Sequence, residues 1–571
     1  MCWVRYTVTL RVNSRQTPAS KYYYSPVIEM QMQAATESNS EALVLDQRVH
    51  LANDPRRVGT VKYLGAVQGY PGTWVGVDWD NGDAKHDGSV NGVRYFHARS
   101  QSSGSFFRTH NLSSGISFLE ALHLRYRGQS TKEEEDEMYV LSASKKRVAV
   151  ELLGKDKIED KISRLEELRS ASLSYMGVSN PGSPVEISSV VPNLEELDLT
   201  GNLLSKWKDV GEICKQLPTL SALNLSKNLI GGDIFGLPEL KSIRILVLNY
   251  SGVDWTQVEH LQHLLPVIEE LHLMGNGIST INPTKSSIVR GFDSLRLLNL
   301  EDNNIAEWSE VLKLSFLKRL EQLHLNKNKL NNIFYPDDDT KQKWHSGFDS
   351  PTRTCIPFQN LRCLLLGGNK IGDLTSVDQL NSFPKLMDIR LSENPVSDPG
   401  SSGLPRFVLI ARLEKVEILN GSEISSRERK ESEIRYIRLV MAKLHEKPDE
   451  IKRVHPRFAE LKNFHGIEDE RPSVRTDGPQ KMSSALLCIT LKCVGASIGE
   501  KPPLIKKLPA TTTVGKLKIL CESFFKLKKM KPKLFIQEEG CPLPMLLDDE
   551  MATLMDVGIG NEMTIIVDEE N

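Results

Sequence analysis

The stretch LEELDLTGNLL, residues 194–204, decides the fold of most of this chain, because its spacing LxxLxLxxN returns seven more times. The further copies begin at Leu220, Ile243, Ile268, Leu295, Leu320, Leu361 and Leu386. The polar residue that ends each motif is Asn in every copy but the third, which has Ser251. Successive polar positions lie 23 to 27 residues apart, except for 41 residues between Asn328 and Asn369. Periods of this length predict a solenoid, in which neighbouring units close one another's core.

Each motif places its leucines so that they alternate inward from a short strand. Leu197 and Leu199 are the inward pair of the first copy, and the Asn amide can bond backbone groups at the bend that follows. The pattern resembles leucine-rich repeats, which build an α/β solenoid. Side chains between the inward leucines should line its concave face, and these are Asp198, Asn224, His272, Asn299, His324 and Arg390.

The array is predicted to span residues 160–445, starting with a degenerate copy from Leu165. The segment 405–445 should close it with a strand and a charged amphipathic helix, because a solenoid needs a polar cap. The 41-residue gap implies an insertion at 332–357, rich in Asp, Pro and Gly. Such a loop serves contact in some solenoids and is inert in others, and both possibilities stay open.

Residues 41–115 have no helical period. Short runs such as RRVGTVKYLG and TWVGVDWD are rich in β-branched and aromatic residues, and turn residues separate them. We therefore predict a small antiparallel β-barrel. Residues 116–159 should be a linker that contains one helix and the solvated acidic run KEEEDE at 132–137.

A second linker, 446–483, leads to a last domain at 484–571. Its pattern reads as strand, helix, strand, short helix and strand, and it resembles the β-grasp of ubiquitin-like domains. The chain ends in VDEEN without a Gly-Gly pair, so we expect a docking module that is not conjugated. The chain is thus predicted to be multidomain.

The composition limits the classes of function. The formal net charge of −2 argues against a nucleic-acid-binding protein, and no apolar run is long enough to span a membrane. The eight cysteines form no CxxC pair, which favours reduced thiols. Cys488 with Cys493, and His260 with His263, are weak zinc candidates; strand alternation and a solvated helix explain them better.

No catalytic motif is present. The segment TVGKLK at 513–518 lacks the upstream Gly and the hydroxyl of a P-loop, and neither GxSxG nor HExxH occurs. We expect a binding protein with no enzymatic activity, no cofactor and no metal.

Residues 1–40 carry four basic residues before the first acid, Glu29. A disordered or mispredicted extension, with Met30 or Met32 as another start, is the simpler interpretation. An organelle transit peptide is the alternative.

The segment 74–108 gathers aromatic and Gly residues around Lys85. Exposed ring faces, close backbone approach and one Lys suit an extended peptide that ends in acidic and aromatic residues. The simpler alternative is that Trp74 and Trp79 form the core of a small domain, which would hold for some of these rings.

This segment resembles CAP-Gly domains, whose hallmark is a GKNDG-type loop. Here the loop reads Ala84-Lys85-His86-Asp87-Gly88, with Ala in the usual Gly position, which puts the local backbone geometry of the loop in question. CAP-Gly domains bind acidic-aromatic C-terminal tails such as the Glu-Glu-Tyr end of α-tubulin. The resemblance implies that the tail would meet Lys85, His86, Asp87, Gly88, Trp79, Phe96, Phe106 and Phe107.

The order CAP-Gly, repeats, ubiquitin-like is similar to the tubulin-folding cofactor E family. That resemblance implies a cytoplasmic, cytoskeleton-associated chaperone that takes α-tubulin from cofactor B. It would assemble the αβ-tubulin heterodimer with cofactors D and C, and dissociate dimers with cofactor B. One module would hold the α-tubulin tail, the solenoid the folded body, and the third a partner.

Two other functions stay open: an adaptor that docks on the proteasome through residues 484–571, and a microtubule-associated scaffold. A scaffold usually brings long coiled coils or basic Ser-rich segments, and this chain has neither.

Overall fold

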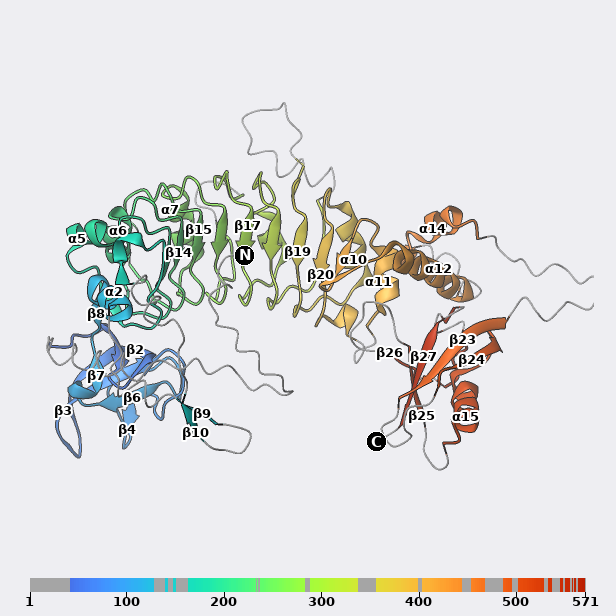
Figure 1. The fold of residues 1–571 in the computed structure, drawn as a ribbon, viewed down its shortest axis with the longest axis horizontal. Helices are drawn as coiled ribbons and strands as arrows, with labels where there is room; N and C mark the ends of the chain where they lie inside the picture. Colours follow the sequence, from blue (N-terminus) through green and yellow to red (C-terminus); the bar gives the residue numbers. More distant parts are fainter. Residues whose placement is uncertain are drawn as a thin grey trace, which may run out of the picture. The chain divides into compact units, whose positions relative to one another are not determined.

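The structure is a computed structural model, and it describes most of the chain (Figure 1). The described residues are 42–127, 139–141, 147–149, 163–232, 234, 237–282, 288–336, 356–398, 403–443, 453–467, 486–494, 502–527, 532–536, 545–547, 550–554, 557, 559–560 and 563–569. The predictions for residues 1–40, for the acidic run 132–137 and for most of the insertion lie outside them.

The segment 42–115, here called the β domain, is a five-stranded antiparallel sheet. Its strands lie in the order β6-β3-β2-β1-β7, which confirms the predicted antiparallel β fold. Their bounds are β1 Arg48–Leu51, β2 Asp54–Val67, β3 Tyr70–Trp79, β6 Gly104–Phe107 and β7 Leu112–Ser113. A small hairpin joins β4 Ser89–Val90 to β5 Val93–Arg94, and the 3₁₀ helix η1 covers Thr109–Asn111.

The helix predicted after residue 116 is α2, Phe118–Tyr126, which begins at a capping box formed by Ser117 and Glu120. It is not part of a plain linker. Strand β8, Ile116–Ser117, directly before it, pairs in parallel with β12, Val178–Asn180. The start of the predicted linker is therefore tied to the degenerate first repeat. Strands β9 Tyr139–Leu141 and β10 Arg147–Ala149 form a separate hairpin.

The repeats form a continuous parallel sheet in which each three-residue strand pairs with the next (Figure 1). The strands are β13 Glu196–Asp198, β14 Ala222–Asn224, β15 Ile245–Val247, β16 Glu270–His272, β17 Leu297–Asn299, β18 Gln322–His324, β19 Cys363–Leu365 and β20 Asp388–Arg390. The central residue of every strand is a buried Leu or Ile. The predicted solenoid and its register are confirmed.

Short helices and turns connect the strands. The helices are α5 Pro184–Val190, α6 Trp207–Lys215, α7 Trp255–Gln262, α8 Trp308–Leu312 and α10 Leu374–Gln379. The 3₁₀ helices are η2 Leu165–Glu167, η3 Leu380–Ser382 and η4 Pro395–Ser397, and β11 covers Ser170–Ser172. Trp207 and Trp308 begin their helices and are almost completely buried, so these helices contribute to the same core as the leucines.

The Asn of each motif bonds the backbone of neighbouring repeats, as predicted. Asn303 is 4% exposed; its amide nitrogen donates to Leu273 O and Leu300 O, each at 3.0 Å. Its oxygen accepts from Asn276 N at 3.1 Å and Ile278 N at 3.0 Å. One side chain thus bonds four backbone groups, of which Leu300 O has a second donor in the Asn328 amide at 2.8 Å.

The residue directly before each polar position has a left-handed backbone, a regularity that the sequence pattern did not reveal. These residues are Gly201, Lys227, Tyr250, Gly275, Asp302, Lys327, Gly368 and Glu393. Gly275 also makes room for its neighbour, because a Cβ there would collide with the ring of Tyr250. The Tyr250 hydroxyl then reaches across to Asp302 at 2.8 Å.

The array ends in a helical cap at the predicted place. Strand β21, Ile418–Leu419, continues the parallel sheet, and β22, Ser422–Glu423, turns back on it. Helices α11 Arg406–Arg412, α12 Ser426–Lys443 and α14 Phe458–Phe464 follow the last full repeat and share a buried apolar cluster. Part of the predicted linker 446–483 is therefore helix packed on this cap.

The C-terminal domain is a mixed sheet covered by one helix. Its strands lie in the order β24-β23-β27-β25-β26, and β23 pairs in parallel with β27 at the centre. The elements are β23 Leu486–Cys493, β24 Leu504–Pro509, α15 Val514–Phe525, β25 Pro532–Ile536, β26 Met545–Leu546 and β27 Thr564–Glu569. This is the β-grasp arrangement that the sequence predicted.

One local prediction in this domain is wrong. The sequence predicted a short helix over 546–559, but the described residues there form β26, turns and a bridge between Thr553 and Thr513. Strand β24 was not predicted. Its burial alternates, but the residue types do not follow it, since Ile505 is exposed and Lys506 is half-buried.

Candidate functional site

Strand β3 separates the aromatic residues of the β domain into two sets. Val75, Val77 and Trp79 point to one face, where they form the buried core. Phe107 pairs with Val75, and its ring packs edge-on against Trp79 at 5.6 Å between centroids. Trp79 has no exposed surface. Trp79 therefore lies in the core and offers no surface to a peptide, which corrects its predicted contact. Phe107 lies on the same face but is half-buried, so its contact with a peptide stays a prediction.

The opposite face of β3 carries a cluster of rings around Phe106, which pairs with Gly76. The Phe106 ring lies 5.4 Å from Phe96, 5.7 Å from Tyr95, 6.2 Å from Tyr63 and 6.5 Å from His86. Phe96 lies beneath the cluster and is 6% exposed, whereas Phe106 is half-buried and His86 is exposed. The structure thus brings Phe96, Phe106 and His86 together, as the sequence predicted.

Glycine makes this second layer possible. A Cβ on Gly76 would lie 2.5 Å from Cε1 of Phe96 and 2.9 Å from Cβ of Tyr63. Rings can therefore lie directly on the strand because it has no side chain at this point.

The loop 84–88 crosses the edge of the ring cluster. His86 exchanges two backbone hydrogen bonds with Gly104, at 3.0 and 2.7 Å. Gly88 has φ +95, and a Cβ there would collide with the carbonyl oxygen of Phe96. Gly88 thus shapes the loop, and it is buried, so it offers no surface to a ligand.

Lys85 has the exposure expected of a binding group. Its side chain is exposed, and its ammonium group makes no hydrogen bond or ion pair within the described part of the chain. Other cations of this domain do have partners: Arg48 binds Asp80, Lys62 binds Asp46 and Arg94 binds Asp87. Lys85, next in sequence to the exposed ring of His86, is therefore available to an anionic ligand.

Asp87 instead holds the neighbouring hairpin. Its carboxylate accepts from the Arg94 guanidinium at 2.6 Å and from Ser89 N at 3.0 Å. The hydrogen bond from Arg94, helped by those from Ser89, lowers the pKa of the Asp87 carboxyl. Asp87 thus positions the β4–β5 hairpin through Arg94 and Ser89, and its contact with a peptide stays a prediction.

The Ala in place of the usual Gly is accommodated. Ala84 is not among the residues with positive φ, so its Cβ causes no strain. Its nitrogen donates to Ser102 O at 2.6 Å, and its methyl group packs on the core cluster. Ala84 therefore fits this loop without backbone strain.

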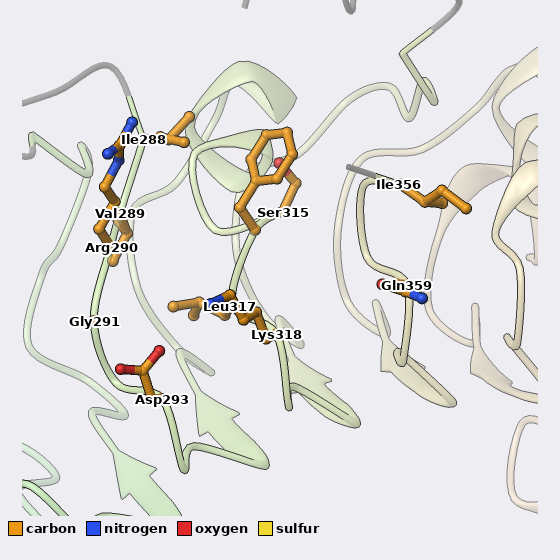
Figure 2. Close-up of a pocket in the computed structure, with 11 residues that line it drawn as sticks. Ile288, Val289, Arg290, Gly291, Asp293, Ser315, Leu317, Lys318, Ile356 and Gln359 are labelled. Carbon is orange, nitrogen blue, oxygen red and sulfur yellow. The ribbon is translucent and has the colours of Figure 1, made fainter. Parts of the chain in front are cut away.

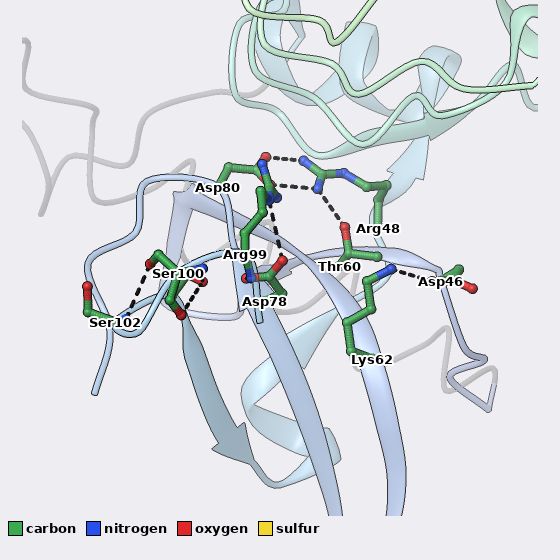
Figure 3. A network of polar contacts seen from close by, with 10 residues as sticks. Asp46, Arg48, Thr60, Lys62, Asp78, Asp80, Arg99, Ser100 and Ser102 are labelled. Atoms are coloured by element: carbon green, nitrogen blue, oxygen red, sulfur yellow. Dashed lines mark hydrogen bonds and ion pairs between the residues drawn. The ribbon is translucent and has the colours of Figure 1, made fainter. Parts of the chain in front are cut away.

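A polar network fixes the segments that carry this loop (Figure 3). The Arg48 guanidinium, 4% exposed, binds both carboxylate oxygens of Asp80 and the Thr60 hydroxyl. Arg99 donates to Asp80 at 3.0 Å and, through its backbone nitrogen, to Asp78 at 3.2 Å. The end of β3 is thus tied to the segment that leads to β6, which carries Phe106.

Tyr63, Tyr95 and Arg108 of this face were not singled out from the sequence, and Trp74 was named there only as a candidate core residue beside Trp79. Tyr63 and Tyr95 complete the ring cluster, 5.2 Å apart. Trp74, on the same face of β3 as Gly76, lies under the Arg108 guanidinium at 3.9 Å, and Arg108 also donates to Thr73 O at 2.9 Å. Trp74 pairs with Gly65, and Gly76 pairs with Tyr63. This register of β2 against β3 brings the side chains together, and it has to be known before the cluster can be predicted.

The predicted concave-face residues of the solenoid lie in one row across the outward face of the sheet. The registers align Asp198 with Asn224, His272 with Asn299 and His324, and Leu365 with Arg390. The prediction omitted a parallel row of outward residues, two positions earlier in each strand: Glu196, Ala222, Ile245, Glu270, Leu297, Gln322, Cys363 and Asp388. Asn299 is 7% exposed, so it offers little surface to a partner.

His324 provides a pH-dependent test of this surface. Burial, helped by the neighbouring His272, lowers the pKa of His324 from 6.5 to about 4. A lowered histidine pKa means that the unfolded chain binds the proton more tightly, so stability is fully present above pH 6.5 and is lost as the pH falls towards 4. We expect the urea midpoint to fall more between pH 7 and pH 4.5 for the wild type than for His324→Gln. A His324 NMR titration near pH 6.5 would contradict this.

Neither a metal site nor a membrane span is found in the described residues. No group of three or more His, Cys, Asp or Glu in these ranges could hold a metal ion, and no helix among them is long and apolar enough to cross a membrane. Cys488 and Cys493 both lie on β23, five residues apart and so on opposite faces of the strand.

Comparisons with known proteins follow the same division into domains. Residues 45–112 match the CAP-Gly domain model, and residues 269–443 match a leucine-rich repeat model. The chain is 63% identical over 536 residues to "Tubulin-folding cofactor E" of Arabidopsis thaliana, covering 94% of this chain and 99% of that protein. It is 30% identical to "Tubulin-specific chaperone E" of Xenopus laevis (84% and 90% covered) and 32% identical to that of Danio rerio (83% and 90%).

A solved structure, the C-terminal ubiquitin-like domain of mouse tubulin-specific chaperone E, aligns with 16% of this chain and 96% of its own, at 24% identity and a TM-score of 0.14.

Proposed function

The chain belongs to the tubulin-folding cofactor E family of tubulin-folding chaperones. We propose that it holds the acidic C-terminal tail of α-tubulin along the surface formed by Lys85, His86 and Phe106, here called the tail groove. The repeats hold the folded body of α-tubulin, and the C-terminal domain docks a partner. With cofactors B, C and D the chain assembles or dissociates the αβ-tubulin heterodimer. This work is non-enzymatic and takes place in the cytoplasm, in association with the cytoskeleton.

The unpartnered ammonium group of Lys85 is the observation that carries this proposal. A chain terminus that ends in Glu-Glu-Tyr presents several carboxylates, and a charge-assisted hydrogen bond to one of them contributes about 1.5–3 kcal/mol. The half-buried ring of Phe106 and the exposed ring of His86 offer an edge-on or stacked surface to an aromatic residue of the tail.

The solenoid contributes a second contact through its outward rows. Asp198, Asn224, His272, His324 and Arg390 present both donors and acceptors. Two weak contacts joined in one chain raise the overall affinity through effective concentration, without any new interaction. The chain thus acts on tubulin by binding alone, and the nucleotide chemistry is carried out by tubulin.

The deciding experiment measures binding of the full chain to α-tubulin with and without its terminal Glu-Glu-Tyr. We expect removal of the three residues to weaken binding clearly. Equal affinity for both forms would contradict the groove. Binding to proteasomes through the C-terminal domain, combined with indifference to tubulin tails, would favour the adaptor function instead.

A further inference from the structure

A strand edge of the β domain, rather than the cleft of the solenoid, offers groups that are open to a ligand. The cleft, about 240 Å³ in volume, is lined by the segments 288–293, 315–318 and 356–359 (Figure 2). Arg290 and Phe316 of its wall already interact with other residues. Strand β6 instead has backbone groups for which the described part of the chain supplies no partner.

Strand β6 is the last strand on its side of the sheet, so only one of its two edges pairs with β3. Gly104 turns its N–H and C=O away from β3, where they exchange hydrogen bonds of 2.7 and 3.0 Å with His86. Backbone groups alternate between the two edges of an antiparallel strand. Phe106, two residues after Gly104 in an unbroken register, therefore turns its own N–H and C=O to the outer edge as well.

The outer edge stays open beyond Gly104. Within the described ranges, neither the N–H nor the C=O of Phe106 has a hydrogen bond along this edge. Arg108 continues the extended backbone; its C=O accepts from Asn111 N at 3.0 Å, and its N–H has no partner among the same residues. An edge with unpaired backbone groups is a template for an added strand.

We propose that the acidic tail binds by antiparallel strand addition to β6, an inference that rests on the proposed function and gives the tail its direction and register. In this direction the carboxyl end of the tail points towards Gly104. His86 already occupies the edge at Gly104, so the tail ends opposite Phe106. The N–H of its last residue donates to Phe106 O, and its terminal carboxylate accepts from Phe106 N. Lys85, next to His86, lies at this end of the edge.

The register assigns a place to each of the last three side chains of the tail. Directly opposed residues of an antiparallel pair share a face of the sheet, so the terminal Tyr lies with Phe106 on the ring cluster. The Glu two positions earlier lies opposite Arg108 on the same face. The Glu between them points to the other face.

Arg108 can accept this second carboxylate while it keeps its present contacts. Its bonds to Thr73 O and Pro71 O use two of the five N–H donors of a guanidinium. The ring of Trp74, 3.9 Å away, holds the group in place. No carboxylate of the described residues forms an ion pair with it, so its charge complements an acidic tail.

The test uses the full chain and a fluorescein-labelled Gly-Ser-Glu-Glu-Tyr peptide with a free carboxyl terminus. N-methylation of the terminal Tyr removes the N–H that donates to Phe106 O, and we expect it to weaken binding by at least about tenfold. N-methylation of the Glu before it is the matched control. Its N–H points away from β6, so binding should be nearly unchanged. Equal effects of the two methyl groups would overturn strand addition.

The place of Arg108 is tested by combining a variant with two further peptides. Arg108→Gln should weaken binding of the parent peptide by about three- to tenfold, because exposed ion pairs are individually weak. It should have little effect on the peptide with Gln two positions before the Tyr, and its full effect on the peptide with Gln next to the Tyr. The same response from both Gln peptides would overturn the assignment of Arg108.

Failure of strand addition and failure of the tail groove give different results. A parent peptide that binds no better than Gly-Ser alone contradicts the tail groove itself. A parent peptide that loses affinity with Lys85→Ala but tolerates the methyl group on its Tyr retains the groove and overturns strand addition. The N-methyl comparison uses the unchanged chain, so it decides the question even if Arg108→Gln destabilises the domain.

Discussion

Replacing Lys85 with alanine is expected to weaken binding of the α-tubulin tail by about ten- to a hundredfold, because one charge-assisted hydrogen bond contributes about 1.5–3 kcal/mol. The ammonium group has no partner in the described structure, so its removal breaks no interaction of the folded chain. Thermal stability should therefore remain unchanged. The measurement is titration of a labelled peptide ending in Glu-Glu-Tyr, together with a melting curve.

Lys62→Ala is the matched control in the same domain. Lys62 is also exposed, but its ammonium group binds Asp46 at 2.6 Å, and it lies outside the loop 84–88. Its loss should leave tail binding unchanged. If Lys85→Ala lowers the melting temperature and Lys62→Ala does not, Lys85 is structural, and the assignment of the groove fails.

Replacing Asn303 with alanine is expected to destabilise the solenoid by about 3–5 kcal/mol, because several buried backbone groups lose their partners at once. The Asn303 amide nitrogen donates to Leu273 O and Leu300 O, and the amide oxygen accepts from Asn276 N and Ile278 N. In a repeat array the damage reaches both adjoining interfaces, since stability is a sum over neighbouring units.

Asn304→Ala provides the comparison for Asn303→Ala. Asn304 is exposed, and its amide makes one long hydrogen bond, 3.4 Å, to Gly277 O. The measurement is urea denaturation followed by far-UV circular dichroism. We expect Asn303→Ala to lower the free energy of unfolding by most of the predicted amount and Asn304→Ala to leave it nearly unchanged. Equal urea midpoints for the two variants would show that the hydrogen bonds of the repeated Asn residues contribute little to stability.

The domain order and the solenoid were predictable because their signals are local and repeated. Leu223 and Leu298 are core residues in any arrangement that keeps the spacing, and the eightfold recurrence leaves one register. The β-grasp was predictable in outline, but β24, with Ile505 and Lys507 exposed, lacks the apolar alternation that marks a strand. The left-handed positions escaped prediction because Gly, Lys, Tyr, Asp and Glu all occupy them.

The candidate groove was predictable only in part. The loop 84–88 carries its Lys, His and Gly in a recognisable order, and the structure places Lys85 and His86 at the surface as expected. The aromatic residues were different, because Phe106 and Phe107 are adjacent in sequence and equally apolar. Pairing with Gly76 sends Phe106 to the ring cluster, and pairing with Val75 sends Phe107 to the core.

The sequence by itself thus determined the repeat register, the order of the domains and the loop that carries Lys85, since each depends on residues close together in the chain. Only the tertiary structure decided which rings gather around Phe106 and which join the core. Successive residues of a strand point to opposite faces, so the side on which Trp79, Phe106 and Tyr63 lie depends on pairing across the sheet.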